Sequence, residues 1–180
     1  AVVRVGAFRP VAAGVRGDEL ARCAATGAGL EVRAYLDSSV MLRVVLGEPK
    51  LLPEWSRITE AVTSEIARVE CLRALDRLRL AGTMDDRELA RRRATMLDLL
   101  SGVETIRLNR VVLDRASEAF PTQLRTLDAV HLASALLMSA RVPALRFATH
   151  DDELATAALA VGLRVIGMAE TWGGRSGTPK

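Results

Sequence analysis

The chain has 180 residues, of which 49% are hydrophobic and 26% are charged; this balance suits one globular domain with a sizeable core and excludes wholesale disorder. Its formal net charge of +3 permits contact with a polyanion but is too small to identify a dedicated nucleic-acid coat. Cys23 and Cys71 lie far apart, with no CxxC pair and no Cys/His cluster. This excludes a zinc motif and a disulfide framework, and predicts two small buried thiols in an intracellular protein.

The first 33 residues differ in composition from the rest of the chain. Gly, Ala and Arg dominate this segment, and its five arginines and three acidic residues give it a net charge of +2. Arg4, Arg9 and Arg16 interrupt its apolar stretch, so it lacks the unbroken core of a signal peptide, and no later run reaches membrane-spanning length. We therefore predict a cytoplasmic protein without membrane contact, in which residues 1–33 form a mobile extension and residues 169–180 a flexible tail.

From residue 33 onward, short apolar runs alternate with amphipathic stretches. The apolar runs predict strands at 33–37, 61–64, 103–108, 145–149 and 163–166. The helical periodicity between them predicts helices at 39–46, 64–81, 85–101, 110–119, 127–140 and 151–161. Glycines follow several of the predicted helices, and prolines fall in the connections. Alternating strands and helices predict an α/β fold around a parallel sheet, over residues 34–168.

Acidic residues follow two of the predicted strands. Asp37 ends "AYLD", and Asp151 comes just after "LRFAT". In a parallel sheet, ligands gather at the carboxyl ends of the strands, so an acid at such a position carries more functional information than one on a helix surface. Asp37 and Asp151 are therefore candidate site residues.

A third acid is predicted in the helix that follows "AVTS", where Glu65 and Glu70 compete. Five residues at about 100° each place these two glutamates roughly 140° apart, so only one of them can face a common site. Glu70 shares a stripe with Ala67, Cys71 and other small or apolar residues, where an unpaired carboxylate is unfavourable. Glu65 lies in the first turn of the predicted helix, where interaction with the helix dipole is enough to explain an acidic residue. Glu70 is the better candidate.

The fourth candidate is Asp128, in the apolar helical sequence "LRTLDAVHLASALL". Taken alone, an acid in the first turn is explained by the helix N-terminus. Taken together, four acids that converge at one end of a sheet would repel one another unless a cation neutralises them. Oxygen ligands suit Mg²⁺ or Mn²⁺, and such an ion favours phosphodiester hydrolysis as the reaction class.

Four segments together resemble the successive signature segments of PIN-domain proteins, and specifically the VapC-like toxins of bacterial toxin and antitoxin pairs. In chain order they are "YLDSSVMLRVVL", "VTSEIARVECLRAL", "LRTLDAVHLASAL" and "FATHDDELATAALAVGLRVI". The resemblance covers about residues 34–168. It does not extend to residues 1–33, because the usual compact toxin begins almost at its first strand.

The resemblance implies a fold, a site and a set of partners. The fold is a three-layer α/β/α sandwich with a short parallel sheet. The four family acids match Asp37, Glu70, Asp128 and Asp151, which would act as both metal ligands and catalytic residues. Ser39 and Thr149 match hydroxyl positions that could orient bound water. The implied activity is Mg²⁺- or Mn²⁺-dependent cleavage of RNA, by a protein that commonly forms a homodimer and is blocked by a cognate antitoxin.

The neighbouring aspartates of "FATHDDELATAA" can be told apart by spacing. Thr149 and Asp152 have the T-x-x-D spacing of a capping box, which assigns Asp152 to helix initiation. Asp151 is then left without a capping role, and we expect it to turn toward the other three acids.

Several other residues have competing interpretations. Arg125 could hold a phosphate of the substrate, or it could pair with a nearby carboxylate. His131 is expected to be a packed residue with a hydrogen bond. His150 is expected to have a packing or surface role, since metal-activated water needs no histidine base. The arginines of "RELARRRATM" are expected to form a solvated helix face.

Two other kinds of function compete with RNA cleavage. One is a non-catalytic PIN-like module that binds RNA or protein, which the loss of an acid would favour; none is lost. The other is a phosphate-transferring α/β domain. A receiver needs an acid pair at the first strand and a late lysine, whereas this chain has only Lys50 and Lys180. A haloacid-dehalogenase-like phosphatase needs an Asp where Ser39 stands.

Overall fold

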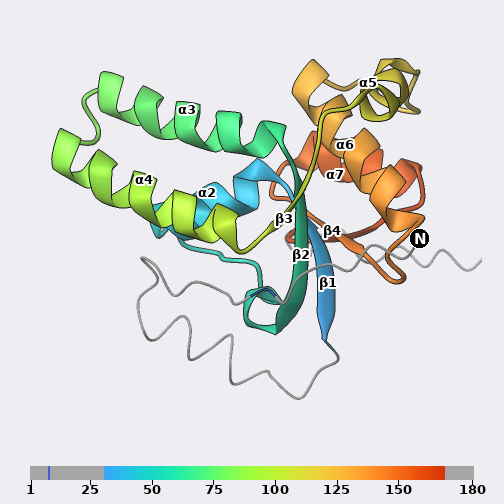
Figure 1. Cartoon of the computed structure of the whole chain (residues 1–180), viewed down its shortest axis with the longest axis horizontal. Coiled ribbons are helices and arrows are strands. Elements are labelled where there is room, and N and C mark those ends of the chain that lie inside the picture. The colour runs from blue at the N-terminus through green and yellow to red at the C-terminus, as the bar shows by residue number, and fades with distance from the viewer. Residues whose placement is uncertain (1–7, 9–30, 169–180) are drawn as a thin grey trace, which may run out of the picture.

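The computed structural model describes Phe8 and residues 31–168 (Figure 1). Most of the predicted extension, the predicted tail and Cys23 lie outside these residues. The strands are β1 (Val32–Leu36), β2 (Ile58–Ser64), β3 (Glu104–Ile106), β4 (Arg146–Ala148) and β5 (Arg164–Ile166). The helices are α2 (Ser38–Leu46), α3 (Ile66–Leu80), α4 (Asp86–Ser101), α5 (Arg110–Ser117), α6 (Thr126–Ser139) and α7 (Asp152–Ala160), with a 3-10 turn, η1 (Trp55–Arg57), before β2.

The five strands form one parallel sheet in the order β3-β2-β1-β4-β5. The chain runs outward from β1 to β2 and β3, then crosses back to β4 and β5. Because strand–helix–strand crossovers are right-handed, this reversal of direction moves the connecting helices to the opposite face of the sheet. Helices α2, α3 and α4 therefore cover one face, and α5, α6 and α7 cover the other (Figure 1). The predicted three-layer α/β/α sandwich is confirmed.

The central strand β1 supplies side chains to both faces. Val32, Ala34 and Leu36 belong to the apolar cluster under α2, α3 and α4, whereas Tyr35 belongs to the cluster under α6 and α7. This alternation follows from the two-residue period of a strand. Tyr35 therefore points toward α6, while the residues that follow it in the chain end the strand at the edge of the sheet.

The predicted strands and helices are all present, with shifted ends. The largest shift is at β2, which begins at Ile58 and not at residue 61. Its first half carries Glu60, which pairs with Arg33 on β1 at 3.2 Å; a polar residue of this kind hides a strand start from a search for apolar runs. No helix in the described part of the chain is long and apolar enough to cross a membrane.

Phe8 lies in the segment predicted as an extension, yet it is only 5% exposed. Its ring packs edge-on against Trp55, with the ring centroids 5.6 Å apart and an interplanar angle of 82°. Its backbone N–H donates to the carbonyl of Thr59 in β2 at 2.8 Å. This residue of the first 33 therefore contributes directly to the folded core.

Candidate active site

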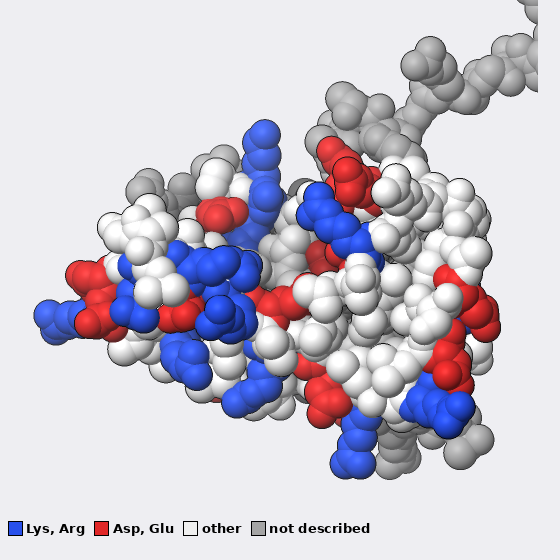
Figure 2. Space-filling model, turned by 90° about the horizontal axis from the view of Figure 1, so that it is seen from above, with Lys and Arg blue, Asp and Glu red and all other residues white. Residues whose placement is uncertain are grey.

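The sheet order determines where a site can form. Strands β1 and β4 are neighbours, but the connections that leave them run to opposite faces of the sheet. At such a switch point, the carboxyl ends of the two strands border a crevice. Asp37 follows β1 and its N–H donates to Ala148, the last residue of β4, at 3.0 Å. Seen from above, acidic side chains lie in a hollow between the lobe of α3 and α4 and the rest of the molecule (Figure 2).

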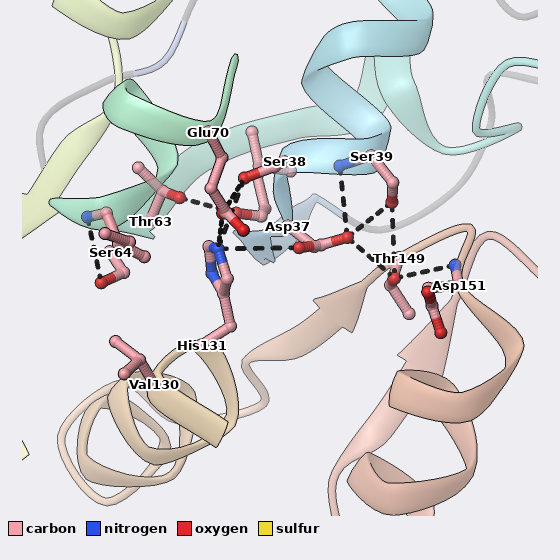
Figure 3. Close-up of polar contacts among 12 residues, drawn as sticks. Asp37, Ser38, Ser39, Thr63, Ser64, Glu70, Val130, His131, Thr149 and Asp151 are labelled. Atoms are coloured by element: carbon pink, nitrogen blue, oxygen red, sulfur yellow. Dashed lines mark hydrogen bonds and ion pairs between the residues drawn. The ribbon is translucent and has the colours of Figure 1, made fainter. Parts of the chain in front are cut away.

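Asp37 is buried and firmly held. It is the N-cap of α2, with extended backbone angles of φ −75° and ψ 157°. A single carboxylate oxygen, Oδ2, accepts three hydrogen bonds: from Ser39 N at 3.2 Å, from Ser39 Oγ at 2.6 Å and from Thr149 Oγ1 at 3.0 Å (Figure 3). These donors compensate the burial of the charge. The two predicted hydroxyls thus contact Asp37, and their role in orienting water stays a prediction.

Asp151 is the N-cap of α7, which corrects the sequence prediction. Its Oδ1 accepts from Leu154 N at 2.9 Å, and Asp152 is the first helical residue. The capping box predicted for Thr149 and Asp152 is wrong. The hydroxyl of Thr149 is already committed, because it donates to Asp37 and accepts from Asp151 N at 3.0 Å. Thr149 thereby joins the ends of β1 and β4.

Glu70 projects from α3 toward the same end of the sheet. Its Oε2 accepts from Ser38 Oγ at 2.6 Å and lies 2.6 Å from Nε2 of His131 (Figure 3). Desolvation pushes the pKa of Glu70 upward, but the hydrogen bond from His131, the charge of His131 and the hydrogen bond from Ser38 outweigh it, so the pKa is lowered. Glu70 therefore carries its negative charge at neutral pH.

His131 joins this site, which the sequence reasoning missed. Its ring is 1% exposed. Besides Glu70, it contacts the hydroxyl of Tyr35, 2.8 Å from Nδ1, and its Nε2 lies 3.8 Å from Oδ1 of Asp37. Burial lowers the pKa of His131. The hydrogen bond to Glu70 and the charge of Asp37 raise it by more than burial lowers it, so the net shift is upward. The sequence offers one signal: His131 follows Asp128 by three residues, and thus faces the same side of a helix.

Asp128 lies in the first turn of α6. Its pKa is raised, first by desolvation and then by the charges of Asp151 and Asp37, with a smaller effect of Glu70. Among the described residues, its carboxylate has no hydrogen bond. The fold therefore brings all four predicted acids within electrostatic reach of one another, and the repulsion falls most heavily on Asp128.

The four acids fit a cation by their chemistry, although they are not drawn together around one point. In the part of the chain that the structure describes, no three His, Cys, Asp or Glu side chains are close enough to hold a metal ion. Yet Oδ1 of Asp37, Oε1 of Glu70, Oδ2 of Asp151 and both oxygens of Asp128 accept no hydrogen bond from another described residue. Such free, mutually repelling oxygens are a suitable donor set for Mg²⁺ or Mn²⁺.

Arg125 and Glu65 contact groups outside this acid cluster. The exposed guanidinium of Arg125 lies 3.8 Å from Glu153, and its charge lowers the pKa of Asp128. Arg125 thus pairs with a carboxylate, and contact with an RNA phosphate stays a prediction. Glu65 accepts from Leu108 N at 3.0 Å, so it fixes the connection after β3 and does more than complement a helix dipole.

The remaining candidates have structural roles. His150 is half-buried, and its Nδ1 donates to the carbonyl of Gly167 at 2.8 Å, a contact compatible with the predicted packing role. Cys71 is a free, buried thiol, and burial raises its pKa to about 12. Arg91 and Arg92 both pair with Glu88 on α4. Arg91 is exposed, as predicted for a solvated helix face, whereas Arg92 is half-buried and also donates to the carbonyl of Val45 in α2, so the prediction is wrong for this residue.

Comparison with known proteins gives consistent matches. The PIN domain family matches residues 34–159, a range that contains all four acids. Ribonuclease VapC46 of Mycobacterium tuberculosis (strain ATCC 25618 / H37Rv) is 38% identical over 135 residues, which cover 73% of this chain and 95% of that protein. Ribonuclease VapC47 of Mycobacterium tuberculosis (strain CDC 1551 / Oshkosh) is 30% identical over 135 residues, covering 71% and 91%. The crystal structure of PAE2754 from Pyrobaculum aerophilum matches with a TM-score of 0.46 and 17% identity, over 74% of this chain and 83% of that one.

Proposed function

This chain belongs to the PIN-domain family and is VapC-like, and from that premise we propose that it is a toxin that cleaves RNA with Mg²⁺ or Mn²⁺ and is inhibited by a cognate antitoxin. The observation that carries the proposal is the acid cluster at the switch point of the sheet, where Asp151, Asp37 and Glu70 all raise the pKa of Asp128. A carboxylate whose ionised form is disfavoured by neighbouring negative charges gains more from a divalent cation than an isolated carboxylate does.

The residues that would hold the ion are Asp37, Glu70, Asp128 and Asp151. When bound, the ion would lower the pKa of a water ligand and stabilise charge on the phosphodiester. The free oxygens of Asp37 and Glu70 are presented by carboxylates whose other oxygen is already fixed by hydrogen bonds. Asp128 has no such restraint, so its side chain can turn toward the ion without breaking a hydrogen bond.

The chain's own groups also shape the site around the reacting phosphate. Thr149 and Ser39 fix the orientation of Asp37, and the Thr149 hydroxyl accepts from the backbone of Asp151, so a shift at one acid is felt at the other. Arg125 stands exposed at the start of α6, one turn before Asp128, where it can exchange Glu153 for a phosphate of the RNA.

Cleavage of a structured RNA by the purified protein tests the proposal. We expect cleavage in Mg²⁺ or Mn²⁺, and none after EDTA removes the ion. Asp37→Asn and Asp128→Asn should each reduce it on the order of a thousandfold, while Asp152→Asn, which changes the neighbouring acid of α7, serves as the matched control. If both site variants cleave the RNA as well as the wild type, the assignment of the site is wrong.

A non-catalytic role gives a different result in the same assay. A module that only binds RNA would retard the RNA in a gel without cutting it, and EDTA would leave the retardation unchanged. We also propose that the protein forms a homodimer in the cytoplasm and binds its antitoxin through the face that carries the acid cluster. Light scattering of the purified protein measures the first, and protection of the RNA by added antitoxin measures the second.

A further inference from the structure

We propose that His131 is a positioning residue that fixes the carboxylate of Glu70 in the active site (Figure 3) by linking it to Tyr35. The inference rests on the proposed function, since it assigns Glu70 to a metal-binding cluster. It goes beyond that function because it names a residue that is not itself among the four acids.

The protons of the contact follow from its geometry. An ionised carboxylate only accepts hydrogen bonds, so Nε2 of His131 must carry the proton that it donates to Oε2 of Glu70 at 2.6 Å. In the neutral ring, Nδ1 is then the acceptor, and the hydroxyl of Tyr35 donates to it at 2.8 Å. When the ring carries both protons, Nδ1 donates to Tyr35 instead. Either way, the ring bridges a fixed phenol and the carboxylate.

Tyr35 is a rigid anchor for this bridge. It lies in the central strand β1, its side chain is fully buried, and its ring stacks on Phe147 of the neighbouring strand, with the centroids 5.3 Å apart and an interplanar angle of 8°. The rings of Tyr35 and His131 meet edge-on at 5.9 Å. The sheet therefore sets the position of the imidazole, and the imidazole sets the position of Glu70.

Glu70 needs such a restraint more than Asp37 and Asp151 do. Asp37 and Asp151 are short side chains that cap helices, whereas Glu70 has three rotatable side-chain bonds. Its hydrogen bonds come from Ser38 on α2 and His131 on α6. With both donors on Oε2, Oε1 is the oxygen left for a ligand. Removing His131 leaves Ser38 as the single described donor and lets the carboxylate swing.

Two substitutions separate the ends of the bridge. The amide of Gln can take the place of Nε2, so His131→Gln retains a donor for Glu70 but loses the contact with Tyr35. The amide of Asn can take the place of Nδ1, so His131→Asn does the reverse. The measurements are Mn²⁺ affinity by titration calorimetry, kcat and KM on RNA, and thermal unfolding without metal. We expect His131→Asn to weaken Mn²⁺ binding and to lower kcat, each by about tenfold, with KM unchanged. We expect His131→Gln to stay within about threefold of the wild type.

A variant cycle distinguishes positioning from general support of the fold. If His131 acts through Glu70, His131→Asn should weaken Mn²⁺ binding in the wild type but add nothing in a Glu70→Gln background. A residue that only supports the fold would lower the unfolding temperature and act equally in both backgrounds. Where His131→Asn does not fold, Tyr35→Phe, which removes one oxygen from the anchor, replaces it, with an expected loss of about threefold in Mn²⁺ affinity.

The outcomes separate the two proposals. If the wild type binds Mn²⁺ and cleaves RNA while His131→Asn matches it in both, or if the two backgrounds lose affinity equally, the positioning role is overturned and the proposed function stands. If the wild type neither binds Mn²⁺ nor cleaves RNA, the proposed function fails, and the role of His131 with it.

Discussion

The two halves of the acid cluster are held in opposite ways. Asp37 and Glu70, on the side of β1 and α3, accept five hydrogen bonds between them from Ser38, Ser39, Thr149 and His131. Asp128, on the side of α6, accepts none from the described residues and has a raised pKa. The carboxylate of Asp151 accepts one hydrogen bond, from Leu154 N in the helix that it begins.

The two halves of the cluster therefore differ in kind: Asp37 and Glu70 are preorganised by hydrogen bonds, whereas Asp128 is subject to charge repulsion. Donors that surround Asp37 and Glu70 keep their oxygens in place before any ligand arrives, which reduces the reorganisation needed when a ligand binds. Asp128 instead carries an unfavourable interaction with its neighbours, which a cation would relieve. The first half would thus give the site its shape, and Asp128 would favour the binding of positive charge.

The largest expected effects come from neutralising one acid in each half of the cluster, and the unfolding temperature should change in opposite directions. Asp37→Asn and Asp128→Asn should both reduce cleavage on the order of a thousandfold. In EDTA at pH 7, however, Asp37→Asn should lower the unfolding temperature, because a neutral amide accepts hydrogen bonds more weakly than a carboxylate. Asp128→Asn should raise it, by about 2–4 °C for each kcal/mol of repulsion relieved.

The gain in unfolding temperature expected for Asp128→Asn should depend on pH, and the direction of that dependence follows from the pKa of Asp128. The folded pKa of Asp128 lies above its ordinary value, so the folded state binds a proton more tightly than the unfolded chain. Its ionised form therefore destabilises the fold above the folded pKa, and the penalty disappears as the pH falls below the ordinary value. The advantage of Asp128→Asn should shrink on acidification. A constant advantage across pH, measured by thermal unfolding, would contradict the repulsion.

A middle-sized effect tests the double role of Asp151. Asn caps a helix about as well as Asp does, whereas Ala loses about 1 kcal/mol at this position. Asp151→Asn should therefore keep the unfolding temperature and lose cleavage about a hundredfold. Asp151→Ala should lose both. Cleavage rates and melting curves of the two variants, with Asp152→Asn as the control, check this; equal activity of Asp151→Asn and the control would leave Asp151 a cap alone.

The smallest effect comes from the hydroxyls that hold Asp37. Thr149→Val keeps the shape of the side chain and removes the bonds to Asp37 and Asp151 N. We expect cleavage and Mn²⁺ affinity to fall about tenfold, as is usual when an outer partner of a metal ligand is removed. Thr149→Ser, which restores the hydroxyl, should recover most of both. If Thr149→Val and Thr149→Ser have the same cleavage rate and Mn²⁺ affinity, the hydroxyl of residue 149 does not hold Asp37 in place.

The positions of the acids follow from the sequence to different degrees. Asp37 and Asp151 could be found because strand ends are visible in the pattern and parallel strands share one edge. Glu70 could be chosen over Glu65 because helical arithmetic allows only one of them to face the site and Glu70 lies on the apolar stripe of the helix. The assignment of the α7 cap to Asp152 failed because the spacing of Thr149 and Asp152 fits a local motif, and local spacing does not show that the Thr149 hydroxyl is already bound to Asp37, 112 residues away.

His131 and Phe8 show what the pattern of residues leaves open. A histidine on an apolar helix is interpreted from sequence as a packing residue. With α6 packed near β1, its two ring nitrogens form hydrogen bonds with Tyr35 and Glu70. Phe8 lies in a stretch whose composition differs from the rest of the chain, and its contacts with Trp55 and Thr59 make it part of the core. Both depend on partners that are far away in sequence.

The sequence by itself determined the alternation of strands and helices, the α/β class and the acids that stand at strand ends, because these rest on periodicity and on the geometry of a single element. Only the tertiary structure decided which oxygen of each acid is held, which acid begins α7, and that a buried histidine links the sheet to Glu70. Hydrogen bonds of 2.6–3.0 Å between α2, α3, α6 and the end of β4 require elements to be placed in space, and periodicity contains no information about that placement.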